Sequence, residues 1–234
     1  MIDSDAIINL TRSVFEKSGA LKGRTFETIT QTSYSKLHST PLVPLNLKID
    51  VEKFLIEINQ FSQYFEKWGT DFDLPRYGLA LVNKCGNLHT PDVVNQSLME
   101  WNKNHPDKPC LELDFTKPTP VLDLPSLAPL NVFTGHWCRS NIFKLEKDSE
   151  FKPHIDTLLP SMWFRLWGTT NTENTVVRFY DNHTKEMIAA SNIEPGRIYL
   201  IDTSIVHDAY ASDTVYQFFL SVKPSAESII ESLL

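Results

Sequence analysis

The chain has 234 residues, of which 41% are hydrophobic and 22% are charged, and its formal net charge is −7. This composition is typical of a globular protein, and the acidic balance argues against a nucleic-acid-binding function, which usually needs a basic surface. Three cysteines without CxxC spacing exclude a disulfide framework and a zinc finger, and they favour a reducing compartment.

The start of the chain lacks the basic and then apolar run of a signal peptide. No apolar run approaches the ~18 residues that a membrane span needs. We therefore expect a cytoplasmic protein with no membrane and no nucleic-acid partner, and the sequence leaves its oligomeric state open.

The first 130 residues predict helices joined by extended segments. Apolar residues at helical spacing indicate two amphipathic helices, the second of them capped by Asp50. Six prolines in the last part of this region favour an extended connection over the surface. The expected elements are helices over residues 3–18, 50–67 and 91–104, a strand over residues 76–82, and the extended connection over residues 106–129.

From residue 131 the pattern changes to short strands separated by turn signals such as Asp181-Asn182 and Pro195-Gly196. Eight short strands predict a sandwich or barrel. With the metal triad described below, we expect a mainly β fold with flanking helices, a cupin-like jelly roll or double-stranded β-helix. Residues 131–234 would form this metal-binding core and residues 1–130 would pack on it, as one compact domain. The expected strands are residues 140–145, 151–156, 161–167, 175–180, 186–190, 197–201, 206–211 and 215–222.

His154 and Asp156 are the first candidate metal ligands. On a strand, side chains two residues apart point to the same face, so an imidazole and a carboxylate would converge there. His207 follows 51 positions after Asp156, just beyond another strand-like run. Two imidazoles and one carboxylate form the facial triad of non-haem Fe(II) oxygenases, which leaves open positions for a co-substrate and O2.

The run from Gly196 to Lys223 resembles the C-terminal part of the aspartyl/asparaginyl β-hydroxylases and the related bacterial proline hydroxylases. The resemblance lies in Asp202-Thr203-Ser204, followed by His207 and then by Ser212-Asp213. Upstream, Pro153-His154 and Arg165-Leu166 look like the proline, first metal histidine and downstream arginine of that family. In all, the resemblance covers about residues 131–223.

This resemblance implies a dioxygenase with Fe(II) as cofactor and 2-oxoglutarate as co-substrate, built on a double-stranded β-helix. The metal would be held by His154, Asp156 and His207. Oxidative decarboxylation of 2-oxoglutarate would give succinate and CO2, and the iron would hydroxylate the substrate. The substrate could be an amino acid, a peptide side chain or a small metabolite.

One position departs from the family pattern. The family usually has an arginine ten positions after the second metal histidine, where it pairs with the distal carboxylate of 2-oxoglutarate, but this chain has Gln217. An amide can donate hydrogen bonds but cannot form a bidentate ion pair. Either another cation takes this part, with Arg165 as first candidate and Arg178 as second, or 2-oxoglutarate is not the co-substrate.

Two other functions therefore stay open at this point. The chain could be a cupin-type metalloenzyme that does not use 2-oxoglutarate, which Gln217 favours. It could also be a non-catalytic β-sandwich binding module, which would hold no metal.

Overall fold

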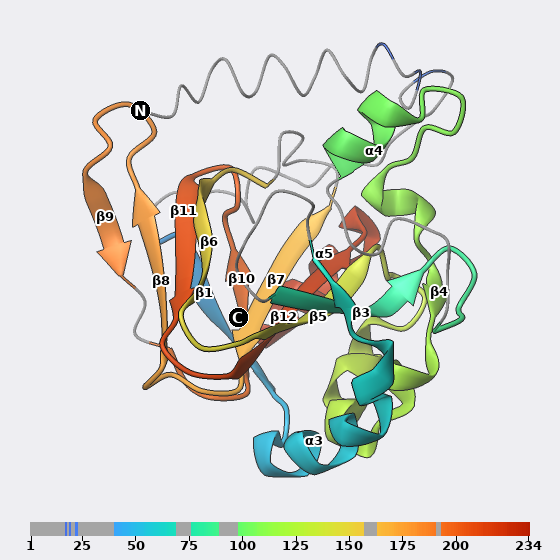
Figure 1. Ribbon diagram of the computed structural model, residues 1–234, viewed down its shortest axis with the longest axis horizontal. Coiled ribbons are helices and arrows are strands. Elements are labelled where there is room, and N and C mark those ends of the chain that lie inside the picture. Colours follow the sequence, from blue (N-terminus) through green and yellow to red (C-terminus); the bar gives the residue numbers. More distant parts are fainter. Residues whose placement is uncertain are drawn as a thin grey trace.

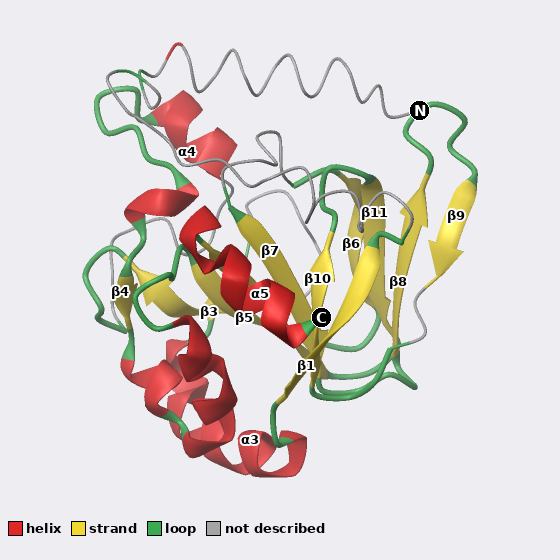
Figure 2. Ribbon diagram, turned by 180° about the vertical axis from the view of Figure 1, so that it is seen from behind, coloured by secondary structure: helices red, strands yellow, loops and turns green. Residues whose placement is uncertain are grey.

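The computed structural model describes residues 40–68, 76–88, 98–156, 163–190 and 193–234, together with residues 17, 19 and 22. Two antiparallel β-sheets form the centre of the molecule, and short helices gather on one side of the larger sheet (Figures 1 and 2). The helix expected over residues 3–18 lies almost wholly outside the described residues.

The larger sheet has the strand order β1-β10-β7-β12-β5-β3-β2, and β4 pairs with β3 at its edge. Its strands are antiparallel, and β12 at the centre pairs with β7 on one side and β5 on the other. The strands are β1 (Leu42–Lys48), β2 (Glu66–Lys67), β3 (Arg76–Asn83), β4 (Lys117–Pro118), β5 (Ser140–Leu145), β7 (Phe164–Thr169), β10 (Arg197–Ile201) and β12 (Val215–Val222).

The smaller sheet has the order β6-β11-β8-β9. Its strands are β6 (Ser149–His154), β8 (Thr175–Tyr180), β9 (Met187–Ala190) and β11 (Val206–Ala211). From β5 to β12 the chain passes back and forth between the two sheets, so that each sheet takes four of these eight strands. This alternation defines the jelly roll. The predicted mainly β fold, a double-stranded β-helix, is confirmed.

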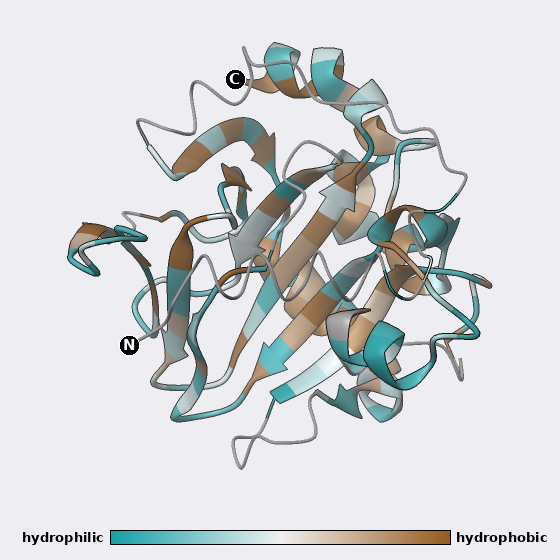
Figure 3. Ribbon diagram, turned by 90° about the horizontal axis from the view of Figure 1, so that it is seen from above, coloured by the Kyte–Doolittle hydropathy of each residue, from teal (hydrophilic) through white to brown (hydrophobic). Residues whose placement is uncertain are grey.

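The two faces of the larger sheet carry different hydrophobic clusters. Phe218, Leu220 and Val222 of β12 belong to the cluster beneath the helices. Val215 and Phe219 lie on the other face, which packs against the smaller sheet inside the barrel. Successive side chains of a strand point to opposite faces, which explains this division. Hydrophobic and hydrophilic bands alternate along the strands in Figure 3.

Helices α3 and α5 cover the outer face of the larger sheet, and α5 crosses in front of the strands in Figure 2, whereas α4 packs in a separate cluster. Phe54 of α3 and Ile230 of α5 are fully buried in the outer cluster. The helices are α3 (Val51–Glu57), α4 (Leu98–Asn104) and α5 (Glu227–Leu233), and the 3-10 helices are η1 (Ile58–Tyr64), η2 (Glu112–Asp114), η3 (Pro120–Asp123), η4 (Pro125–Phe133) and η5 (Pro224–Ala226).

Two predicted elements differ from the structure. The helix expected over residues 50–67 is α-helical only to Glu57 and continues as the 3-10 helix η1. The connection over residues 106–129 is not simply extended, because it contains η2, η3 and the start of η4. Proline fixes φ near the helical value and needs no donor in a first turn, and both η3 and η4 begin at a proline.

The region before residue 131 also builds the sheet itself. β1 pairs with β10 at one edge, and β3 pairs with β5 at the other, so the predicted strand at residues 76–82 is present as β3. No helix among the described residues is long and apolar enough to cross a membrane.

Candidate metal centre

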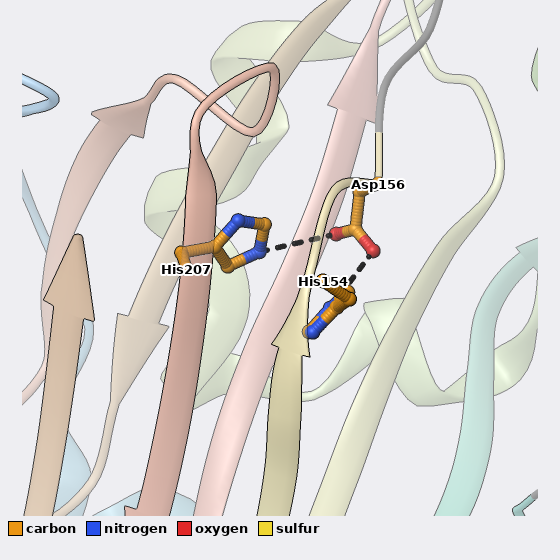
Figure 4. Close-up of side chains that lie close together, drawn as sticks. All are labelled: His154, Asp156 and His207. Atoms are coloured by element: carbon orange, nitrogen blue, oxygen red, sulfur yellow. Dashed lines mark ion pairs between the residues drawn. The ribbon is translucent and has the colours of Figure 1, made fainter. Parts of the chain in front are cut away.

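His154 and His207 face each other across two neighbouring strands of the smaller sheet. His154 ends β6, His207 is the second residue of β11, and the two are direct register partners. Their ring centroids are 4.5 Å apart (Figure 4). The register shifts by one residue just before His154, where Pro153 has no N–H to donate to the ladder.

Asp156 completes the group from a position beyond the strand. The sequence predicted that strand alternation would place it beside His154, but β6 ends at His154. Asp156 is held instead by a backbone hydrogen bond from its N–H to the carbonyl of Thr203, 3.1 Å long. Its carboxylate oxygens lie 3.1 Å from His154 Nε2 and 3.8 Å from His207 Nε2.

Backbone carbonyls fix the orientation of both imidazoles. His154 Nδ1 lies 2.5 Å from the carbonyl oxygen of Lys152, and His207 Nδ1 lies 2.9 Å from that of Ile205. A carbonyl oxygen can only accept, so each Nδ1 carries the hydrogen. In the neutral imidazole this leaves the lone pair on Nε2, which faces Asp156 in both residues. Hydrogen bonds from the second ring nitrogen to a carbonyl orient metal-bound histidines in known sites.

A cation between the three side chains would relieve the repulsion among their donor atoms. Burial alone would lower the pKa of His154, but the charge of Asp156 raises it overall. Burial would raise the pKa of Asp156, but His154 and His207 hold it well below its usual range. Two lone pairs and a carboxylate repel one another unless a proton or a metal ion lies between them, and His207 Nε2 is buried without a hydrogen-bond partner.

The donor atoms of His154, Asp156 and His207 all lie within 4.8 Å of one another. They approach a common point from one side, which is the arrangement of a facial triad. Two imidazole nitrogens and one carboxylate oxygen suit a first-row divalent metal such as iron. The residues present therefore fit the metal that the sequence pattern predicts.

The segment before β11 determines the position of His207. Asp202 accepts a hydrogen bond from the N–H of Ser204 at 2.9 Å, which forms a tight turn. Asn182 accepts from the N–H of Val206 at 2.9 Å and so ties this turn to the end of β8. The sequence motif Asp202-Thr203-Ser204 thus has a structural part in presenting His207.

Arg165 lies on the inner face of β7, at the end of the barrel that carries the metal candidates. Tyr199 of β10 pairs with Trp167 of β7. The same antiparallel register places Arg165 beside Ile201. Thr203, which binds the N–H of Asp156, follows Ile201 by two residues. Its guanidinium donates to Ser221 Oγ at 2.6 Å and lies 3.5 Å from Glu112. We call this end of the barrel the open end.

Glu112 also faces Arg139, at 3.9 Å. Arg139 and Glu112 are 5% and 8% exposed, so one buried carboxylate serves two arginines. A third arginine, Arg76 of β3, is 2% exposed and lies 4.2 Å over the ring of Phe151. Burial lowers the pKa of Arg76 to about 10.

Gln217 and Arg178 lie on different sides of the barrel wall. Gln217 is fully buried on the inner face of β12, where its register partner is Thr169 at the far end of β7 from Arg165. Arg178 alternates with the buried Val177 and Phe179 and therefore faces outward. It forms an ion pair with Asp208 at 2.8 Å. The structure thus keeps Arg178 away from the other predicted site residues.

Sequence reasoning did not single out Glu112 or Arg76. Glu112 lies in a proline-rich connection 53 positions before Arg165, and Arg76 begins a strand 78 positions before His154. Neither has a local motif, because each reaches the barrel only through sheet pairing and loop packing. A charged residue within an apolar strand, as in Arg76-Tyr77-Gly78-Leu79, was the one available signal.

No family model and no curated protein matches this chain. Among solved structures it is similar to an oxidoreductase of the 2OG-Fe(II) oxygenase family from Burkholderia pseudomallei, with 12% identity, 83% of this chain and 90% of that chain covered, and a TM-score of 0.43.

It is also similar to a prolyl hydroxylase from Trichoplax adhaerens in complex with a hypoxia-inducible-factor peptide, with 10% identity, 96% and 94% of the chains covered, and a TM-score of 0.45. A ribosomal oxygenase from Escherichia coli is matched over 42% of this chain and 26% of its own, with 16% identity and a TM-score of 0.33. All these scores are below 0.5, and the assignment of the fold rests on the strand order given above.

Proposed function

We propose that this chain is an Fe(II)-dependent oxygenase that uses 2-oxoglutarate or a related 2-oxo acid to hydroxylate an amino acid, a peptide side chain or a small metabolite. The observation that carries this proposal is the pair of imidazoles whose Nδ1 atoms are held by carbonyls while both Nε2 atoms face Asp156. His154, Asp156 and His207 would hold the metal, and three side-chain ligands leave positions for a chelating co-substrate and O2.

The surroundings of the triad favour an anionic ligand. Arg139 and Arg165 share one carboxylate, that of Glu112. A divalent metal with Asp156 as its one acidic ligand would add further positive charge. Desolvated positive charge is costly unless it is paired, so a ligand with a carboxylate would stabilise this end of the barrel.

Each residue then has a definite part. The metal, when bound, supplies the activation of O2. The carbonyls of Lys152 and Ile205 keep the two imidazoles in the ligating orientation. Arg165, whose Nε is buried without a hydrogen-bond partner, is our proposed contact for a carboxylate of the 2-oxo acid. Aromatic and aliphatic side chains line the inner wall behind the triad, while the side chains of His154 and Asp156 stay partly exposed.

The direct test is anaerobic titration of the protein with Fe(II) and then 2-oxoglutarate, followed by visible absorption. We expect a metal-to-ligand charge-transfer band that requires both additions. In air, 2-oxoglutarate should then be consumed to succinate. A protein that binds neither Fe(II) nor Co(II) would contradict the proposal.

Because Gln217 stands where the related family has an arginine, a second function is a candidate: a cupin-type metalloenzyme that does not bind a 2-oxo acid. This alternative predicts metal binding without any spectral or calorimetric response to 2-oxo acids. Metal binding and 2-oxo acid binding are therefore measured separately.

A further inference from the structure

We infer that Asp202 and Asn182 are positioning residues of the metal centre, each of which acts on one ligand through a single peptide group. Asp202 acts on Asp156, and Asn182 acts on His207. Both peptide groups belong to the turn of residues 202–206, at the start of β11. The inference rests on the proposed metal centre and adds two residues to it.

Asp156 depends on this turn because it lies beyond the end of its strand. β6 ends at His154, and the pairing of β6 with β11 reaches only as far as His154 and His207. Past this pair, the N–H of Asp156 donates to the carbonyl of Thr203 at 3.1 Å. The side chain of Asp156 is 26% exposed, so packing does not hold it on every side. The position of Thr203 therefore determines where the carboxylate of Asp156 lies.

Asp202 holds the other side of the peptide that binds Asp156. Its Oδ1 accepts from the N–H of Ser204 at 2.9 Å, and this N–H belongs to the same peptide group as the carbonyl of Thr203. A trans peptide is planar, and its N–H and C=O point in opposite directions. The peptide thus joins Asp202 on one side to Asp156 on the other. Asp202 is itself 3% exposed, and its own N–H donates to the carbonyl of Pro41 at 2.8 Å.

Asn182 stands in the same relation to His207. Nδ1 of His207 donates to the carbonyl of Ile205 at 2.9 Å. The N–H of that peptide belongs to Val206, and it donates to Oδ1 of Asn182 at 2.9 Å. Nδ2 of Asn182 also donates to the carbonyl of Ser204 at 3.2 Å, so the amide contacts two successive peptides of the turn. Hydrogen bonds in such a chain polarise and strengthen one another, so Asn182 makes the Ile205 carbonyl a better acceptor for His207.

His154 is held differently, which provides a contrast inside the same site. Its Nδ1 donates to the carbonyl of Lys152, and the nitrogen of that peptide belongs to Pro153. Proline has no N–H, so a side chain cannot hold this peptide from the opposite side as Asn182 does for His207. The orientation of His154 comes from β6 itself, whereas that of His207 depends on a side chain from the connection between β8 and β9.

The test compares Asn182→Ala and Asp202→Ala with the wild type. Asn83→Ala is the matched control, because Asn83 also braces a turn with both atoms of its amide, at the end of β3. Equilibrium dialysis measures the Co(II) affinity. Proton NMR of the Co(II)-loaded protein in water reports the N–H of each ligating imidazole as a separate, strongly shifted and exchangeable signal. Circular dichroism shows whether each variant is folded.

We expect Asn182→Ala and Asp202→Ala each to lower the Co(II) affinity about tenfold, an effect typical of residues that support metal ligands. Asn182→Ala should shift or broaden one imidazole N–H signal, that of His207, and Asp202→Ala should leave both signals in place. Asp202→Asn keeps an acceptor for the N–H of Ser204 and should restore the affinity. Wild-type affinity with unchanged signals in Asn182→Ala would overturn the inference, as would an equal loss of affinity in Asn83→Ala.

Amide hydrogen exchange in the wild type is a measurement that needs no variant. A metal bound by Asp156 and His207 would hold both peptides of the turn from one side. The N–H groups of Ser204 and Val206 should therefore exchange more slowly in the Zn(II)-loaded protein than in the metal-free protein. Equal exchange rates would overturn the inference even where a variant does not fold.

Three outcomes separate this inference from the proposed function. A wild type that binds neither Co(II) nor Zn(II) would remove the metal centre and the inference with it. If the wild type binds Co(II) but not N-oxalylglycine, a stable amide analogue of 2-oxoglutarate, the use of a 2-oxo acid fails and the metal affinities alone decide the inference. If every variant binds Co(II) as tightly as the wild type, the proposed function stands and the inference alone is overturned.

Discussion

The two ends of the barrel interior differ in how their polar groups are satisfied. At the open end, charged side chains meet partners: His154 and His207 face Asp156, and Arg165 meets Glu112 and Ser221. At the opposite end, where β12 begins, the amide of Gln217 and the hydroxyl of Thr175 lack partners, and Arg76 is a buried cation packed on the ring of Phe151. The open end thus gathers charges of both signs, whereas the opposite end holds two neutral polar groups and one cation.

This difference has a physical reason. A buried charge without a partner costs far more than a buried amide or hydroxyl without one. Charged groups in the barrel therefore pack against a partner, as Arg165 does against Glu112 and Arg76 against the ring of Phe151, while neutral groups can be left unpartnered at a tolerable cost.

Replacing Asp156 with Ala should have the largest effect, because among the described residues it removes the only carboxylate that faces both imidazoles. We expect Co(II) affinity to fall by two orders of magnitude or more, since even the outer-shell partners of metal ligands typically contribute about 10–100-fold, and turnover to be lost. Equilibrium dialysis measures the affinity. Asp107→Ala, at an exposed aspartate, is the control. Unchanged metal binding in Asp156→Ala would show that these three residues do not bind the metal.

Arg165→Ala should weaken binding of N-oxalylglycine to the Co(II)-loaded protein by about two orders of magnitude, on the same estimate for loss of one partner of a buried charged pair. Metal affinity should stay near the wild-type value, because Arg165 contacts Glu112 and Ser221 rather than the metal candidates. Calorimetry with and without Co(II) separates the two effects. An unchanged constant for N-oxalylglycine would assign the carboxylate contact to another residue.

Gln217→Leu should stabilise the ligand-free protein. Leucine has a similar volume and needs no hydrogen bond, whereas each buried polar group without a partner costs about 1–3 kcal/mol. For a chain of this size, we expect the melting temperature to rise by roughly 2–12 °C. Scanning calorimetry measures this shift against Gln63→Leu, at an exposed glutamine of η1. A lower melting temperature would mean that the amide already has a partner in the free protein.

Arg178→Ala should have the smallest effect on ligand binding, below about twofold, because this side chain lies on the outer face of the smaller sheet. Its ion pair with Asp208 is partly exposed, at 42% for the arginine side chain, so its loss should cost about 1 kcal/mol or less of stability. The same calorimetric titration as for Arg165→Ala provides the comparison. A large loss of N-oxalylglycine affinity would place Arg178 in the site after all.

The eight core strands and the residues of the candidate metal centre could be predicted from the sequence. Alternating short strands with turn signals follow from local chemistry, and the period of two assigns each residue to a face of its strand. The pattern His154-x-Asp156 with a distant His207 was equally readable. This pattern correctly predicted that the three side chains lie close together, although Asp156 reaches His154 from beyond the end of the strand.

Only the tertiary structure decided what surrounds this centre. The outward direction of Arg178 depends on which face of β8 packs inside, and an arginine in an apolar strand does not reveal that. Glu112 and Arg76 join the interior through contacts between segments far apart in the chain. The unpartnered amide of Gln217 is likewise a property of its surroundings, because hydrogen-bond satisfaction depends on every neighbouring strand and not on the sequence around one residue.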